Sequence, residues 1–200
     1  MYVRLEVGDS LHHDEAPPRI LSVGGWCIDS IQHISNGHPL HKGTKGRTDA
    51  EIQRMFLVWH DSVRKCLAKA TSSQKIAHDN IDEAFARTLL VDDLYTGKNW
   101  VSGAAAPITD PVGCHARVLA NLKRAREGCA PLRYVDYDWS EDSTFAQQAF
   151  AACLGRCFAI TARGFFCLAP AVSMVGDGVA IFSGAATPFI IRDTSPRNTG

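Results

Sequence analysis

The sequence predicts an α+β fold in which a small antiparallel sheet, or partly open barrel, is built from both ends of the chain. Short apolar runs typical of strands occur within residues 1–35 and again within 155–192. Between them, residues 48–154 carry apolar side chains at helical spacing. We therefore expect a single α+β unit over residues 1–200, with a helical block inserted between the N-terminal strands and a C-terminal small β-barrel segment.

The N-terminal region combines a clear strand signal with an interrupted one. Val3, Leu5 and Val7 alternate with charged residues, which is the period of a half-buried strand. Residues 19–34 are rich in Ile, Leu, Val and Trp, but adjacent glycines at positions 24 and 25 interrupt them. This interruption predicts two strand segments joined by a bulge or bend. The glycine-rich residues 36–47 predict a surface loop.

Capping signals mark the start of two helices. Thr48, followed three residues later by Glu51, forms a capping box. Asn80 and Glu83 repeat this pattern, and the apolar face after them continues until Gly97, which we expect to end that helix. After the first signal, seven apolar residues fall on one helical stripe: Ile52, Met55, Phe56, Trp59, Val63, Cys66 and Leu67.

Two further helices are expected at about residues 114–127 and 142–154, where apolar residues again recur at helical spacing. The first of these has a basic side opposite its apolar side, which indicates a solvated face; binding of an acidic partner surface is the alternative. This basic face consists of Arg117, Lys123, Arg124 and Arg126.

The last part of the chain changes to short apolar runs separated by turns that contain glycine or proline. Four such runs occur, at residues 157–161, 164–168, 179–182 and 188–191. Runs of this length with short connections are typical of strands joined as hairpins. They predict the C-terminal part of the small sheet or partly closed barrel.

The composition excludes several classes of protein. Twenty-one Lys and Arg residues balance 21 Asp and Glu residues, so nothing predicts binding to nucleic acid or to a membrane surface. Seven cysteines, an odd number, without an Asn-x-Ser/Thr sequon favour reduced thiols in a cytoplasmic protein. The start of the chain does not resemble a signal peptide, and no apolar run approaches the length of a membrane span.

Five short motifs occur in order in the C-terminal region. They are Gly155-Arg156 with an aromatic and apolar strand that ends at Thr161, then Gly164, Leu168-Ala169-Pro170, Gly176-Asp177 and Pro188-Phe189-Ile190-Ile191-Arg192. In order and type they resemble the C-terminal region of fungal heterokaryon-incompatibility (HET) domain proteins. Two upstream segments are similar to the same family. Phe85-Ala86-Arg87-Thr88-Leu89-Leu90-Val91-Asp92 looks like its aromatic-x-Arg-Thr-Leu-x-x-Asp helix, and residues 21–31 look like its Gly-x-x-x-Asp-x-Ile strand.

The sequence also departs from that family. Cys167 stands where the family usually has glycine. Family members usually continue beyond the position of Arg192 into one more strand, so the resemblance implies an open barrel edge here. The N-terminal effector domain of the family, with its Tyr-x-x-Leu-Ser-Tyr-x-Trp-Gly strand, has no counterpart in this sequence.

The resemblance implies a non-catalytic accessory or regulatory region that acts through protein contacts in non-self recognition or heterokaryon incompatibility. Its partner would be another protein or a HET effector domain, carried by a longer version of the same chain or by a separate one. No catalytic, cofactor-binding or metal-binding residue carries over, and no cofactor is expected. The residues that match the family motifs are expected to be structural: Phe85, Arg87, Thr88, Leu89, Asp92, Gly155, Arg156, Thr161, Gly164, Leu168, Pro170, Gly176, Asp177, Pro188, Phe189 and Arg192.

A second interpretation is an enzyme of unknown, hydrolase-like class that uses a His and Asp pair or a cysteine. His60 and Asp61 are adjacent, but neighbours on a helix point about 100° apart, so adjacency does not make a catalytic dyad. We expect a solvated helix edge there. Cys153, Cys157 and Cys167 are expected to be buried thiols that pack as small apolar side chains.

A third interpretation is a zinc-dependent binding module. His33, His38 and His41 lie close together in and before the glycine-rich loop, and His12 and His13 precede two acidic residues. Clustered imidazoles can bind zinc, which takes four tetrahedral ligands. Because no Cys-x2-Cys pair accompanies them, we expect these histidines to be solvated loop residues.

Overall fold

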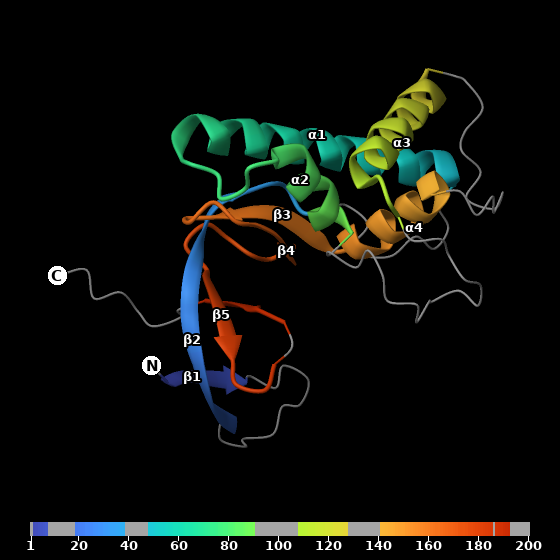
Figure 1. The fold of residues 1–200 in the computed structure, drawn as a ribbon. Helices are drawn as coiled ribbons and strands as arrows, with labels where there is room; N and C mark the ends of the chain where they lie inside the picture. Colours follow the sequence, from blue (N-terminus) through green and yellow to red (C-terminus); the bar gives the residue numbers. More distant parts are fainter. Residues whose placement is uncertain are drawn as a thin grey trace.

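The structure is a computed structural model that describes residues 2–7, 19–38, 48–90, 108–127, 141–185 and 187–192. Within these ranges the chain forms helices and strands in an order that matches the expected α+β arrangement (Figure 1). In chain order they are β1 (Tyr2–Val7), β2 (Arg19–Ile34), α1 (Asp49–Ser73), α2 (Ile81–Leu89), α3 (Pro111–Arg126), α4 (Glu141–Cys153), β3 (Arg156–Thr161), β4 (Phe166–Pro170), β5 (Gly178–Phe182) and β6 (Phe189–Ile191).

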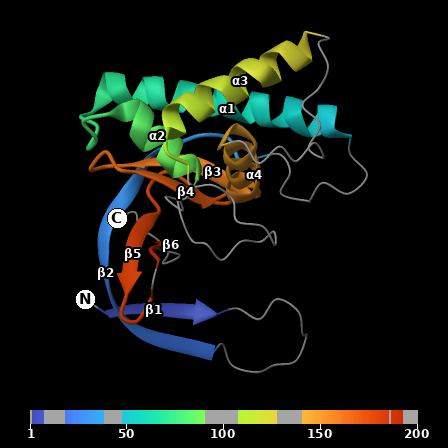
Figure 2. The same cartoon turned by 45° about the vertical axis from the view of Figure 1, so that its right-hand side comes forward.

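The predicted sheet built from both ends of the chain is confirmed. Its strands follow the order β4-β3-β2-β5-β6, and β1 also pairs with β2, with every pairing antiparallel. The N-terminal strand β2 therefore lies between C-terminal strands on both sides. The sheet curls into a half-barrel, and the helices gather over its β3 and β4 end, away from β1 and β5 (Figures 1 and 2).

The expectation of two segments within residues 19–34 is wrong, because β2 is one continuous strand that changes partner along its length. It pairs first with β1, then with β5 from Gly25 to Ser30, and finally with β3 from Ile31 to Ile34. Its register shifts occur after residue 27 and after residue 31, not at the glycine pair. A Cβ at Gly25 would lie 2.5 Å from the Phe182 ring, so this glycine permits close packing rather than breaking the strand.

Both capping signals form as predicted. The Glu51 amide donates to Thr48 Oγ1 at 3.3 Å, and the Thr48 amide donates to Glu51 Oε2 at 2.8 Å. The Glu83 amide donates to Asn80 Oδ1 at 3.1 Å, which begins α2. This helix ends at Leu89, and the expected stop at Gly97 lies outside the described residues.

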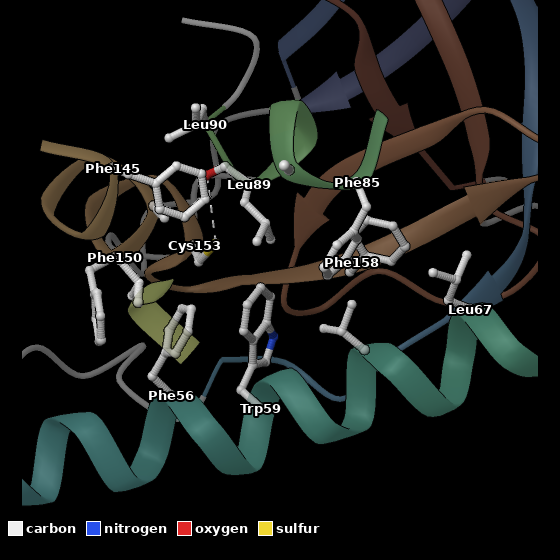
Figure 3. Close-up of a cluster of buried hydrophobic side chains, with 14 of the residues drawn as sticks. Phe56, Trp59, Leu67, Phe85, Leu89, Leu90, Phe145, Phe150, Cys153 and Phe158 are labelled. Atoms are coloured by element: carbon white, nitrogen blue, oxygen red, sulfur yellow. Dashed lines mark hydrogen bonds between the residues drawn. The ribbon is translucent and has the colours of Figure 1, made fainter. Parts of the chain in front are cut away.

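The main core lies between the helical layer and β3. The apolar stripe of α1 contributes Phe56, Trp59 and Val63, all almost fully buried. Figure 3 shows Trp59 facing β3, with Phe85 of α2 beside Phe158 of β3. Burial of one large apolar side chain contributes about 1.5 to 3 kcal/mol, so this cluster is the chief source of stability for the helical layer.

Strand β3 is buried on both faces. Phe158 and Ile160 belong to the core under the helices, whereas Cys157 and Ala159 belong to a second, smaller cluster. Alternate side chains of a strand point to opposite faces, so these two pairs lie on different sides of the sheet. The same short strand therefore joins the helical layer to the half-barrel.

The hairpin between β3 and β4 is fixed to the connection between α1 and α2. Gln74 Nε2 donates to the Thr161 carbonyl at 2.9 Å, and the Ala77 amide donates to the Gly164 carbonyl at 3.1 Å. Gly164 has φ +86°, and a Cβ there would lie 2.5 Å from the Lys75 carbonyl oxygen. The turn therefore needs glycine both for its backbone angle and for this contact.

We predict that Gly164→Ala lowers the free energy of unfolding by about 2 to 4 kcal/mol, because left-handed strain adds to a backbone clash. Gly176→Ala is the matched control, since Gly176 has φ +94° but no atom within 4 Å of the added Cβ. Its cost should be about 1 to 2 kcal/mol, from backbone strain alone. Urea denaturation of the wild type and the two variants measures both losses of unfolding free energy. Equal losses would contradict a steric role for the Lys75 carbonyl oxygen at position 164.

Candidate functional site

Two of the motifs that carry the family resemblance meet in space at Asp177 and Arg192. Arg192 Nε donates to Asp177 Oδ1 and Nη2 donates to Oδ2, each at 2.8 Å. Asp177 is almost fully buried, whereas the Arg192 side chain is 43% exposed. The Arg192 guanidinium holds the pKa of the Asp177 carboxyl below its usual value, and the Met174 amide, which also donates to it, adds to this. The carboxylate is therefore charged, paired and fixed.

This ion pair holds a loop against the sheet, and we call it the clamp. Arg192 Nη2 also donates to the Val172 carbonyl, and the Met174 amide donates to Asp177 Oδ2, both at 2.8 Å. The backbone beside Asp177 pairs with Ile31 in both directions, because the Ile31 amide donates to the Asp177 carbonyl and the Gly176 amide donates to the Ile31 carbonyl. The clamp thus joins the loop after β4 to β2 and to the end of β6.

The loop that the clamp holds exposes apolar side chains. Val172 is 77% exposed, Met174 55% and Val175 57%. Other exposed apolar side chains lie on the sheet, including Trp26 at 61%, whose cross-strand partner on β5 is Ile181. Directly opposed residues on antiparallel strands share a face, so these two present one apolar surface.

The remaining C-terminal motif residues make backbone or packing contacts. The Gly155 and Arg156 carbonyls accept from the Ala171 and His38 amides at 3.0 and 2.7 Å. Thr161 Oγ1 accepts from the Phe165 amide at 3.1 Å, within the turn that contains Gly164. The others lie along the sheet: Leu168 packs beside the main core, the Pro170 carbonyl accepts from the Ser173 amide, Phe189 contacts the Phe182 ring, and exposed Pro188 precedes β6.

The upstream motif lies on α2, apart from the clamp. Phe85 and Leu89 are buried in the main core, and Phe85 contacts the Phe158 ring edge to face at 5.4 Å between centroids. Arg87 forms an ion pair with Glu83 at 2.9 Å, and Thr88 Oγ1 donates to the Ala84 carbonyl at 2.7 Å. Asp92 lies outside the described residues. The motif residues therefore do not converge on one cleft; those described here form structural contacts in two regions.

The expectation of a solvated helix edge is wrong for His60, which is only 4% exposed. Its Nε2 lies 3.1 Å from His115 Nε2 on α3, and we call these two residues the histidine pair. Asp61 is exposed, as expected for the next position on a helix. The pair lies among aromatic rings, where His60 stacks against Phe56 and His115 contacts Phe85 edge to face.

Burial keeps both members of the histidine pair uncharged at neutral pH. It lowers the pKa of His60 to about 3, with further contributions from His115 and two nearby cations, and that of His115 to about 4. A short contact between two neutral imidazoles requires one Nε2–H to donate to the lone pair of the other Nε2. Sequence analysis missed His115, although it lies on the same helical stripe as Val118 and Leu122.

The prediction of solvated loop histidines is also wrong for His33 and His38, because both are buried. His33 Nε2 lies 3.2 Å from Ser73 Oγ, and the His38 ring lies beside Trp59 with 5.3 Å between centroids. His12, His13 and His41 lie outside the described residues. Among the residues that the structure does describe, no group of three His, Cys, Asp or Glu side chains is placed to hold a metal ion.

Five described cysteines have thiols that burial holds in the protonated form. Burial raises the pKa of Cys66 and Cys167 to about 11 and that of Cys114 and Cys157 to about 12, and it also raises that of Cys153. The expectation of buried thiols is confirmed for Cys153 and Cys157, whereas Cys167 is half-buried. A thiolate nucleophile is disfavoured at these five positions, because the reactive form would be rare at neutral pH.

The predicted basic face of α3 is in part an ion-pair surface. Arg117 Nε donates to both carboxylate oxygens of Asp142 at 2.9 and 2.8 Å, which ties α3 to α4. Lys123 and Arg124 are exposed, and nothing is described of the Arg126 side chain.

No protein-family model, no curated protein and no solved structure matches the chain. In the described residues, no helix combines the length and apolar character needed to cross a membrane.

We predict that Asp177→Asn lowers the free energy of unfolding by about 1 to 3 kcal/mol, because it weakens charge-assisted hydrogen bonds to a buried acceptor. The pKa of Asp177 is lowered in the folded protein, so its contribution should be present above about pH 4 and lost as the pH falls further. Exposed Asp61→Ala is the control and should change the free energy by less than about 0.5 kcal/mol. Denaturation at pH 7 and pH 3 tests this, and a difference between Asp177→Asn and wild type that is the same at both pH values would contradict it.

Proposed function

We propose that the chain is a non-catalytic accessory or regulatory region of a HET-like fungal protein, which acts in the cytoplasm through protein contacts. Its role would lie in non-self recognition or heterokaryon incompatibility, and its partner would be a HET effector domain or another protein, in the same longer chain or in a separate one. The order of the motifs supports this, and so does the meeting of two of them at the clamp.

The observation that carries the proposal is the loop held by the clamp. Val172, Met174 and Val175 are more than half exposed, yet their backbone is fixed by Asp177 and Arg192. Exposed apolar side chains on a fixed backbone favour binding, because little conformational entropy is lost when a partner covers them. We therefore infer that the motif residues matter because they present this loop.

The exposed residues of the sheet support the same role. Trp26 and Ile181 form an apolar cross-strand pair, and Phe189 on β6 is 45% exposed. Aromatic side chains are enriched among the residues that contribute most to protein interfaces. The apolar character of these exposed sheet residues therefore agrees with a role in binding another protein.

Inducible expression in fungal cells, alone and together with a HET effector domain, tests the proposal. We predict that the chain alone leaves growth unchanged, whereas its presence changes the cell death caused by the effector domain severalfold. A variant with Val172→Ser, Met174→Ser and Val175→Ser should lose this effect, because it removes only exposed apolar contacts. The measurement is viability against induction level, with soluble protein quantified in each strain.

Val58→Ser is the matched control, since Val58 is an exposed apolar residue on α1 far in sequence from the loop. It should retain the full effect on the effector domain. Death caused by the chain alone and abolished by Arg87→Ala with Asp92→Ala would overturn the accessory role. Effector-induced death that is the same with and without the chain would also count against it.

A further inference from the structure

We propose that His60 and His115 form a proton-sensitive latch that holds α3 against α1 and releases it on acidification. The latch is a property of the helical layer and does not depend on the proposed role of the clamp. It rests on where the two imidazoles lie, on the hydrogen bond that joins them and on the charges that face them.

The position of the pair makes it a link between separate elements. His60 lies on α1 and His115 on α3, 55 residues apart in sequence, with their Nε2 atoms 3.1 Å apart. Phe85 of α2 and Phe145 of α4 both contact the His115 ring. All four helices therefore meet around this hydrogen bond, and its loss removes a polar contact between α1 and α3.

The hydrogen bond between His60 and His115 cannot persist when both imidazoles are protonated. In the neutral pair, one imidazole donates its Nε2–H and the other accepts with its lone pair. One added proton leaves this bond in place and is opposed by the cost of burying charge, whereas protonation of both imidazoles would place two Nε2–H groups, each carrying part of a positive charge, face to face in a largely apolar site. Both the repulsion and the cost of burying charge oppose that state, so the doubly protonated pair is stable only when water can reach it.

The surrounding charges increase this sensitivity. Arg64 of α1 and Lys123 of α3 both act electrostatically on the pair, and both are cations. Asp82 of α2 faces His115 and favours its protonation, but it is 72% exposed and lies 3.9 Å from Arg64. On α4, Asp142 binds Arg117 and Glu141 binds the Thr109 hydroxyl. Within the described residues, protonation therefore adds positive charge beside existing cations, and no buried carboxylate there balances it.

Opening of the latch would expose the aromatic rings that pack against His115. Phe85 and Phe145 are each only 1% exposed in the closed state. Separation of α3 from α1 would bring the apolar surface of these two rings into contact with water. Acidification would therefore expose apolar surface that is buried at neutral pH.

The expected response follows from the proton balance. An exposed histidine titrates near 6.5, whereas the closed pair resists protonation until about pH 4 or below. At pH 5, each histidine that is released should favour the open state by about 30-fold, or on the order of 1,000-fold for both. The response therefore begins as the pH falls below 6.5 and grows toward pH 4.

Amide hydrogen exchange of the full chain at pH 7.5 and pH 5.0, corrected for intrinsic exchange rates, tests the latch. Protection of the α3 peptides in wild type should fall by 30-fold or more, while protection of β3 changes much less. The variant His60→Gln with His115→Gln should lose this pH response, because glutamine can hydrogen-bond but does not titrate. His33→Gln is the matched control, since His33 is a buried histidine that contacts Ser73 rather than α3, and it should keep the response.

Three results would overturn the latch. The first is α3 protection in wild type that changes no more with pH than in the double glutamine variant. The second is an equal loss of protection in β3, which would mean global unfolding. The third needs no variant: nitrogen NMR of the histidine rings in wild type should show two neutral imidazoles at pH 6.0, and a cationic ring at position 60 or 115 would exclude the mechanism.

Discussion

The pairing of β2 with strands from the other end of the chain is the constraint on which the rest of the structure depends. Its C-terminal part pairs with β3 and its middle with β5, and the Phe158 amide donates to Ser35 Oγ across 123 residues of sequence. The four helices occur within the chain segment that this contact closes. Closing so long a segment costs entropy before any contact forms, so we expect the apolar burial of β3 on both faces to supply the compensating free energy.

Sequence analysis predicted the features that local chemistry determines. The capping box at Thr48 and the N-cap at Asn80 need only residues three positions apart, and the C-terminal hairpins need only short apolar runs with glycine turns. It failed where a distant residue decides the outcome. Gly25 reads as a strand break until Phe182 is placed against it, and His60 reads as a surface residue until α3 brings His115 to it. Both histidines lie on apolar helical stripes, which indicates that they face the core. The prediction of exposure for His60 gave more weight to its polar side chain than to this position.

The contacts of the motif residues indicate a structural role for these residues, which is distinct from a role in binding. Gly164 fits the hairpin against the connection between α1 and α2, and Asp177 and Arg192 fix the loop after β4 against β2. Such residues can be the same in many proteins because the backbone requires them, while function lies in the side chains that the backbone presents. Sequence motifs of this kind therefore indicate a scaffold more strongly than an activity, which is why the proposed protein contacts are assigned to the exposed loop after β4 rather than to the motif residues themselves.

The two ends of the molecule respond to acid over different ranges of pH. The Asp177 carboxylate has its pKa lowered by Arg192, so the clamp stays charged to a pH below the usual range of an aspartate. The histidine pair contributes less stability as soon as the pH falls below 6.5, because exposed imidazoles bind protons there, whereas buried His60 and half-buried His115 do not. Between these limits the helical layer is weakened while the loop and sheet remain fixed. Contact between Phe85 and Phe158 is one place where that change would reach β3. An acid-induced change in the helical layer can therefore leave the loop proposed for binding intact.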